Sequence, residues 1–324
     1  MGFKWVDFKI TNRCNNKCRY CGVVHDSIDS DEILTTKEIK DTISDSLKFT
    51  HFAFLGGEPS IRENVEDIFS VLETNFKSNV MVITNGLIYN EKLYIALFES
   101  EAANSKIIYS FDSFNKPNFK NQDPFEAIKN IKKIKALAQE YSGFEKIRDV
   151  EIHSVISREN FMNITKLVEF FSNLSIDVSL ALVCPSKFVN NQQSIDYNVF
   201  NYKELKVIIN QLEELKERKI LNFANNVLLN YLRLYPYNKL QMNSICKAGT
   251  NHVIINPDGE VYPCITESYR RKLRFGNIRK KRFKDIYPLL GDFKCTNPFA
   301  PDCWDHFLWK KLGEKIKREE NNGK

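Results

Sequence analysis

The stretch Thr11-Asn12-Arg13-Cys14-Asn15-Asn16-Lys17-Cys18-Arg19-Tyr20-Cys21-Gly22 decides how the rest of this 324-residue chain is interpreted. It holds three cysteines in a C-x3-C-x2-C spacing, close enough for their thiolates to converge on one metal centre. Soft thiolates favour iron–sulfur clusters, zinc or Cu(I). A [4Fe–4S] cluster held only by Cys14, Cys18 and Cys21 would keep one iron open to another ligand. A zinc knuckle with a distant fourth ligand is the structural alternative.

A second motif, Gly56-Gly57-Glu58-Pro59, follows the short apolar strand that we expect over 51–55. Paired glycines allow a ligand to approach the backbone closely. Glu58 offers a carboxylate to an amine, and Pro59 fixes the exit from the turn. Alone, the motif could be a plain turn at a strand end. Downstream of a cysteine motif that itself follows a strand, it indicates a cofactor site.

Together the two motifs resemble those of the radical S-adenosylmethionine (radical SAM) enzymes. The resemblance implies that S-adenosylmethionine chelates the open iron of a [4Fe–4S] cluster through its amino and carboxylate groups, and that segment 56–58 binds the amino group. It also implies cleavage of S-adenosylmethionine to a 5′-deoxyadenosyl radical that abstracts hydrogen from the substrate. The electron would come from a donor of the flavodoxin or ferredoxin type.

Composition narrows the class of protein. The chain is 43% hydrophobic and 27% charged, as in ordinary globular proteins, and no run is apolar enough for a signal peptide or a membrane span. We therefore expect a cytoplasmic protein without a membrane partner, whose eight cysteines bind metal rather than form disulfides.

The net charge of +6 is partly concentrated in the basic run 270–284. The simplest interpretation of that run is a solvated face. The alternative is a binding site for an acidic peptide, a nucleotide or RNA. Since no RNA-binding module is recognisable, we expect no nucleic-acid partner.

Strands and helices alternate up to about residue 183, which predicts parallel βα units and an α/β fold. In such folds, ligands gather beyond the carboxyl ends of the strands. Six units resemble the partial (β/α)6 barrel of the radical SAM enzymes. We expect this barrel over 1–200, a helical connection over 201–240 and a small cluster-binding domain over 241–324. The expected strands are 5–10, 51–55, 80–84, 106–111, 150–156 and 178–183. Among the helices between them, one is expected to start at a cap on Thr35 or Thr36, with Glu38 near the capping-box position, and to end at about residue 49. Another is expected over 61–76, and a long one is expected to open at Asp123-Pro124 and to end at about residue 140.

Polar residues at the ends of the later strands are further candidates for the cofactor site. They are Thr84 and Asn85 on the third strand, Ser110 and Asp112 on the fourth, and His153 on the fifth. The resemblance implies that such residues meet the nucleoside or the substrate. The structural alternatives are a polar strand face, an aspartate that closes a turn, and a histidine that is satisfied internally or exposed.

Four cysteines near the C-terminus, Cys246, Cys264, Cys295 and Cys303, form a second set. Cys246 and Cys264 bracket an expected β-hairpin with an Asn-Pro-Asp-Gly turn. The segments Cys-Lys-Ala-Gly (246–249) and Gly-Asn-Ile (276–278) complete a resemblance to the C-terminal domain of the SPASM and twitch subgroups. The resemblance implies an auxiliary [4Fe–4S] cluster, and four cysteines fit the single-cluster twitch form. Structural zinc is the alternative.

Cys184, the eighth cysteine, ends the sixth expected strand. Most lone cysteines are small buried hydrophobes. A thiol at the mouth of the barrel could instead donate a hydrogen atom to a substrate radical, as in radical SAM peptide epimerases. Cys184 is therefore a candidate catalytic residue.

The function that the resemblance favours is epimerisation or cross-linking of a ribosomally made peptide. The chain begins directly at its first strand, so we expect no N-terminal leader-recognition domain. A dehydrogenase of an aminocyclitol or sugar alcohol is the alternative with a small-molecule substrate. A non-catalytic metal-binding protein is the alternative from another class, and the intact cysteine triad and Glu58 count against it.

Overall fold

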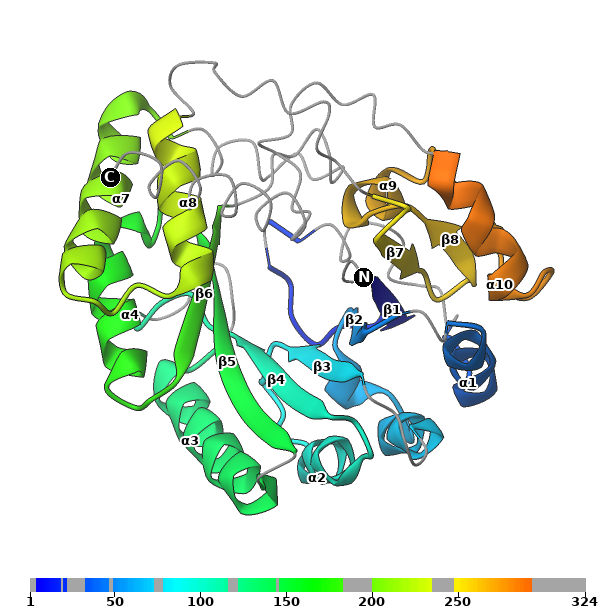
Figure 1. Cartoon of the computed structure of the whole chain (residues 1–324). Helices are drawn as coiled ribbons and strands as arrows, with labels where there is room; N and C mark the ends of the chain where they lie inside the picture. The colour runs from blue at the N-terminus through cyan, green and yellow to red at the C-terminus, as the bar shows by residue number, and fades with distance from the viewer. Residues whose placement is uncertain are drawn as a thin grey trace.

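One curved sheet of nine strands organises the chain in the computed structural model (Figure 1). The structure describes residues 4–18, 20–21, 33–46, 49–72, 78–115, 122–143, 146–182, 200–234 and 248–292. The strand order is β6-β5-β4-β3-β2-β1-β7-β8-β9, and the first six strands are parallel. The predicted α/β barrel-like fold is therefore confirmed. Its strands are β1 (Trp5–Thr11), β2 (His51–Gly56), β3 (Asn79–Thr84), β4 (Asn104–Ser110), β5 (Ile147–Ile156) and β6 (Asp177–Leu182).

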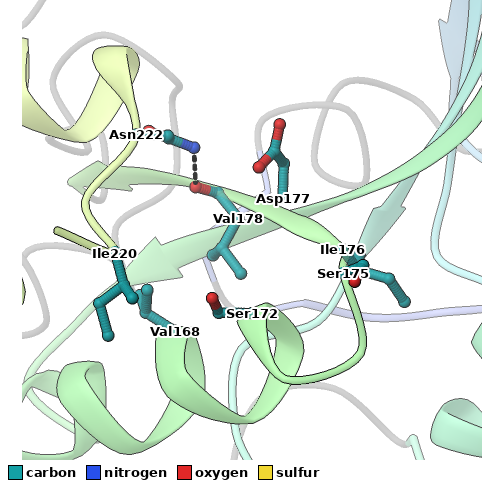
Figure 2. A pocket seen from close by; sticks show the side chains of 8 residues that line it. All are labelled: Val168, Ser172, Ser175, Ile176, Asp177, Val178, Ile220 and Asn222. Atoms are coloured by element: carbon teal, nitrogen blue, oxygen red, sulfur yellow. Dashed lines mark hydrogen bonds between the residues drawn. The ribbon is translucent and has the colours of Figure 1, made fainter.

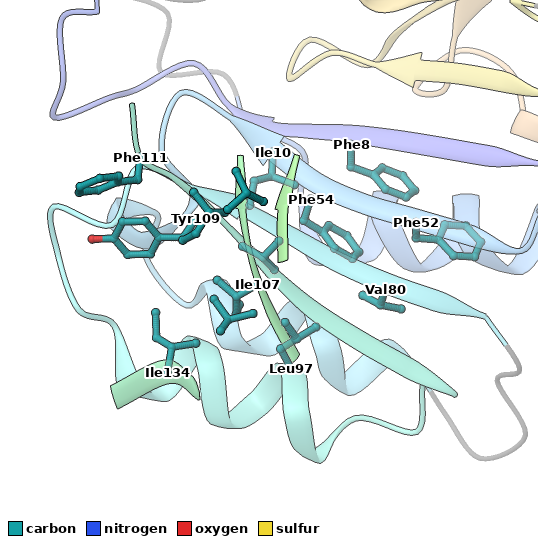
Figure 3. Close-up of a cluster of buried hydrophobic side chains, with 14 of the residues drawn as sticks. Phe8, Ile10, Phe52, Phe54, Val80, Leu97, Ile107, Tyr109, Phe111 and Ile134 are labelled. Atoms are coloured by element: carbon teal, nitrogen blue, oxygen red, sulfur yellow. The ribbon is translucent and has the colours of Figure 1, made fainter. Parts of the chain in front are cut away.

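Helices cover the outer, convex side of this sheet (Figure 1). Alternate strand residues such as Phe8, Phe54 and Ile107 are fully buried beneath them (Figure 3). On the opposite face, Lys106 and Glu151 are only partly buried, and they form an ion pair with 2.7 Å between Lys106 Nζ and Glu151 Oε2. The two faces thus differ as expected for a barrel with a packed exterior and a polar interior. The helices are α1 (Thr36–Asp45), α2 (Glu91–Glu99), α3 (Pro124–Tyr141), α4 (Ile164–Ser172), α7 (Tyr202–Glu217) and α8 (Phe223–Leu234).

Local signals fix several helix starts. Thr35 and Glu38 form a capping box at α1, in which each side chain accepts from the other residue's backbone N–H. Asp123 caps α3, whose first residue is Pro124, a position at which proline costs no hydrogen bond. Both starts were predicted from the sequence.

A helix predicted over 61–76 is wrong in the described part of that range. Two 3-10 segments, Pro59–Ile61 and Val65–Val71, stand in its place. Asn64 between them has a left-handed backbone (φ 51°), which interrupts a helix. The Glu58 side chain also caps the first segment directly after the glycine pair, by accepting from the Ser60 N–H.

The C-terminal hairpin joins the same sheet. Strand β7 (His252–Ile255) pairs in parallel with β1, and β8 (Glu260–Tyr262) and β9 (Gly276–Asn277) extend the edge in antiparallel pairs. The predicted hairpin is confirmed, and β1 is therefore an interior strand. Three short elements complete this C-terminal part. They are helix α9 (Ile265–Arg270), helix α10 (Phe283–Ile286) and the 3-10 helix Tyr287–Asp292 that follows α10.

Two arginines of the basic run attach this part to α1. Arg279 Nε binds Glu38 Oε1 at 2.6 Å, and Arg282 binds Asp45. Other cations of the run, such as Lys280 and Lys281, are exposed. Within the described ranges no helix has the length and apolar composition needed to cross a bilayer.

Buried Arg148 joins the amino ends of β4 and β5 to the end of α2. Its guanidinium donates from Nε and Nη2 to the carbonyls of Phe98, Ser100 and Ala102 at 2.7–3.0 Å, and the residue is only 4% exposed.

We expect Arg148→Met to lower the free energy of unfolding by about 3 kcal/mol, because several buried carbonyls lose their donor. Chemical denaturation would measure this. Arg218→Met, which removes an exposed partner of Glu169 and Glu214, is the control and should change stability little. Equal effects would contradict the role of Arg148.

Candidate cluster and cofactor site

The described candidate residues of the six parallel strands lie toward the carboxyl ends of those strands. The cysteine loop follows β1, Gly56–Glu58 ends β2, and Thr84–Asn85 ends β3. Asp112 follows β4 by two residues, and Ser110 pairs in register with His153 of β5. The fold therefore brings these motifs to one edge, as the sequence predicted.

Backbone packing explains the glycine pair. The Gly57 N–H donates to the Thr11 carbonyl and the Glu58 N–H to the Arg13 carbonyl, each at 2.8 Å. A Cβ on Gly56 would lie 2.2 Å from the Thr11 oxygen, and one on Gly57 would lie 1.9 Å from the Arg13 oxygen. The backbone that approaches these glycines is thus the start of the cysteine loop itself.

Glu58 is fully buried and acts as the acceptor for three donors. Oε1 accepts from the Ser60 N–H at 2.9 Å and from Thr84 Oγ1 at 2.7 Å, and Oε2 accepts from the Asn85 N–H at 2.6 Å. Burial raises the pKa of Glu58, although these hydrogen bonds oppose the shift. In the structure, the Glu58 and Thr84 side chains therefore join the ends of β2 and β3.

Asn85 connects β3 to the cysteine loop. Its Nδ2 donates to Asn15 Oδ1 at 2.9 Å and lies 3.7 Å from Cys14 Sγ, which also accepts from the Asn16 N–H at 3.4 Å. Hydrogen bonds to a ligating sulfur influence the potential of an iron–sulfur cluster. Asn85 is therefore placed to act on the first cysteine of the motif.

The three cysteines of the loop form no disulfide in the described part of the chain, and they are partly exposed. Burial, with a smaller contribution from nearby Cys21 and Glu58, raises the pKa of Cys14 to about 11. A metal must displace that proton when it binds. In the described ranges, no three His, Cys, Asp or Glu side chains lie close enough to hold a single metal ion. A cubane suits a wider spacing, because each cysteine binds a different iron atom.

Asp112 is buried and contacts the cysteine loop through a residue that the sequence analysis missed. Tyr20 lies between Cys18 and Cys21, and its hydroxyl donates to Asp112 Oδ2 at 2.6 Å. Burial first, and then the nearby carboxylate, raise the pKa of Tyr20 well above its usual value, so the phenol remains a donor. The aromatic residue inside the cysteine spacing was the available signal.

Ser110 and His153 lie on the inner face of the sheet. His153 Nδ1 is 3.1 Å from Ser179 Oγ on β6, and Ser179 Oγ donates to the Ile152 carbonyl. The imidazole is therefore held in place by its neighbour on the next strand. Ser110 is half-buried at the same level of the sheet.

The remaining candidates are placed as follows. Cys264 is a buried free thiol directly before α9. Cys184, Cys246, Cys295 and Cys303 lie outside the described residues, so their predicted roles stay predictions.

A pocket of about 80 Å³ lies elsewhere, at the amino end of β6 (Figure 2). Asp177 and Val178 of β6, Ser172 of α4 and Asn222 before α8 line it, and the Asn222 amide donates to the Val178 carbonyl at 2.7 Å. Because the motifs lie toward the carboxyl ends of the strands, this pocket is separate from the candidate site.

Comparison with protein families matches residues 8–158 to the radical SAM superfamily and residues 246–304 to an iron–sulfur cluster-binding domain, SPASM. The first range contains the cysteine triad, segment 56–58 and all candidate strand-end residues. The second contains Cys246, Cys264, Cys295 and Cys303. These matches imply S-adenosylmethionine, a [4Fe–4S] cluster and an auxiliary iron–sulfur cluster.

The chain aligns with individual relatives at low sequence identity but over most of its length. The chain is 25% identical to a tungsten-containing aldehyde ferredoxin oxidoreductase cofactor-modifying protein of Pyrococcus furiosus, over 93% of this chain and 86% of the relative. It is 22% identical to the antilisterial bacteriocin subtilosin biosynthesis protein AlbA of Bacillus subtilis, over 94% of this chain and 64% of the relative.

Two solved structures share the fold. Streptococcus suis SuiB bound to the precursor peptide SuiA aligns with a TM-score of 0.69 and 16% identity, covering 95% of this chain and 70% of SuiB. Native anSMEcpe with bound AdoMet and Cp18Cys peptide aligns with a TM-score of 0.62 and 19% identity, covering 99% of each chain.

The packing of the glycine pair against the cysteine loop can be tested by adding one methyl group. We expect Gly57→Ala to displace the loop and to lower iron uptake on anaerobic reconstitution by about four irons per chain, the content of one [4Fe–4S] cluster. Iron and sulfide analysis would measure this. Gly143→Ala is the control, because nothing lies within 4 Å of its added Cβ, and it should load normally. Normal iron content in Gly57→Ala would contradict the argument.

Proposed function

We propose that this chain, which belongs to the radical SAM superfamily and carries a C-terminal iron–sulfur cluster-binding domain, epimerises or cross-links a ribosomally made peptide. It is an enzyme of the twitch/SPASM subgroup. The observation that carries the peptide proposal is the likeness to peptide-bound structures over nearly the whole chain. The similarity to a bacteriocin biosynthesis protein agrees with it.

In this proposal, Cys14, Cys18 and Cys21 hold the first cluster and Cys246, Cys264, Cys295 and Cys303 hold the auxiliary one. When bound and reduced, the first cluster would supply the electron that cleaves S-adenosylmethionine to a 5′-deoxyadenosyl radical. A flavodoxin- or ferredoxin-type protein would be the electron donor. The chain's own contribution is to bind, orient and exclude water, because the cofactors carry the difficult step.

The strand ends would divide this work. The Glu58 oxygens already accept three hydrogen bonds within the protein. We therefore propose that Glu58 shapes segment 56–58, whose backbone meets the methionine moiety. Asn85 and Thr84 would hold that segment against the cysteine loop, and His153 and Ser110 would face the nucleoside from the inner side of the sheet.

The inner face of the sheet suits a polar chain. Lys106 and Glu151 form an ion pair there and keep 34% and 19% of their side-chain surface exposed. Peptide N–H and carbonyl groups need such partners when they leave water. A dehydrogenase of an aminocyclitol or sugar alcohol remains the alternative, since hydroxyl groups could use the same side chains.

Reconstituted enzyme offers a direct test of the peptide proposal. With S-adenosylmethionine and dithionite, we expect turnover of synthetic precursor peptides encoded beside its gene. Cross-linking should lower the peptide mass by two hydrogens, whereas epimerisation in D2O should replace one hydrogen of the peptide with one deuterium. Mass spectrometry would measure both, with a Cys14→Ala, Cys18→Ala, Cys21→Ala protein as the control. Turnover of an aminocyclitol together with unchanged peptides would favour the alternative.

Cys184 distinguishes the two peptide reactions. If the product is an epimer, the Cys184 thiol would donate its hydrogen atom to the substrate radical. Cys184→Ala should then lower the yield of deuterium-labelled epimer at least tenfold, while 5′-deoxyadenosine still forms. Chromatography and mass spectrometry measure the two products separately. An unchanged yield of the same epimer would eliminate this donor.

A further inference from the structure

We propose that Tyr20 and Asp112 form a latch that positions the cysteine loop for S-adenosylmethionine, and that Asp112 acts through Tyr20 rather than on the cofactor. Neither residue is assigned this role by the family match. The inference depends on the radical SAM chemistry of the chain and not on the identity of its substrate.

The latch crosses from the loop after β1 to the end of β4. Tyr20 lies between Cys18 and Cys21, so a contact that anchors its side chain restricts the backbone of the cysteine loop on either side of it. Its hydroxyl donates to Asp112 Oδ2 at 2.6 Å, and a hydrogen bond to a carboxylate is stronger than one between neutral groups. The two residues are 92 positions apart in the sequence. This contact is therefore a tertiary one that ties the loop to the end of β4, whereas the glycine pair contacts the loop from the end of β2.

Asp112 is itself held rigidly on the other side. Its Oδ1 accepts from the Val155 N–H at 2.8 Å, and its carbonyl accepts from Asn160 Nδ2 at 2.9 Å. The same Nδ2 donates to the Val155 carbonyl at 2.8 Å, and Asn160 Oδ1 accepts from the Ser157 N–H. The residue is only 3% exposed. The end of β5 thus fixes the carboxylate, and the carboxylate fixes Tyr20.

This arrangement fits a positioning residue better than a cofactor ligand. Each Asp112 carboxylate oxygen already accepts a protein donor, Oδ1 from the Val155 N–H of β5 and Oδ2 from the Tyr20 hydroxyl of the cysteine loop. A loop ordered in advance lowers the cost of binding, because less freedom is lost when the ligand arrives. The latch should therefore act mainly on the affinity for S-adenosylmethionine.

The experiment uses the reconstituted full chain and formation of 5′-deoxyadenosine without peptide. We expect Tyr20→Phe, which removes only the hydroxyl, to keep its iron content. Its KM for S-adenosylmethionine should rise at least about tenfold, the loss typical of a hydrogen bond to a charged group, with a smaller fall in kcat. The change that S-adenosylmethionine causes in the EPR spectrum of the reduced cluster should weaken at a fixed concentration.

Tyr141→Phe is the matched control. The Tyr141 hydroxyl donates to Glu99 Oε1 at 3.3 Å, also a tyrosine–carboxylate pair, but between the end of α3 and the end of α2. It should leave KM and the EPR response unchanged. Equal behaviour of Tyr20→Phe and Tyr141→Phe would overturn the proposal.

A double-mutant cycle separates the latch from direct contact with the cofactor. Asp112→Asn keeps an oxygen for the Val155 N–H but changes the partner of Tyr20. If Asp112 acts through Tyr20, adding Asp112→Asn to Tyr20→Phe should raise KM no further. If the increases instead multiply, Asp112 contacts the cofactor independently and the proposal is wrong.

Discussion

The packing of two stretches of backbone, Gly56–Gly57 against Thr11–Arg13, is the constraint on which the site depends. The contact allows no Cβ at either glycine, and two backbone hydrogen bonds, from the Gly57 and Glu58 N–H groups, set where the cysteine loop leaves β1. A side chain could change rotamer to relieve a clash, but a backbone carbonyl that accepts a hydrogen bond cannot move without its neighbours. The position of the cluster cysteines is therefore determined by the sheet rather than by the loop alone.

Polar side chains then connect neighbouring strand ends to that loop. Glu58 accepts donors from β3, Asn85 reaches Asn15 and Cys14, and Asp112 accepts from Tyr20. Buried polar groups of this kind are stable only when they are satisfied, and here they satisfy one another. As a result, protein contacts hold the described part of the loop at Arg13, Cys14, Asn15 and Tyr20. Ligands that bind such a site meet groups whose orientation has already been fixed.

The sequence predicted those features that local pattern controls. Alternation located the six strands, Thr35 with Glu38 located the start of α1, and cysteine spacing located the cluster loop. It failed where the outcome depends on tertiary contacts. The left-handed Asn64 and the cap from Glu58 replaced a helix expected over 61–76. The strand pattern also placed Asp112 at a strand end. It could not identify Tyr20 as the partner of Asp112, because the two residues are far apart in the sequence.

The pairing of β7 with β1 has a consequence for how the two cysteine sets are related. β1 leads directly into the first cysteine loop, and β7 and β8 lead to Cys264. Lys9 of β1 adds a buried contact, because its Nζ lies 2.8 Å from Ser268 Oγ and 3.9 Å from the centre of the Tyr269 ring in α9. The separation between the loop and α9 is therefore set by strand pairing and a buried cation, not by a flexible linker.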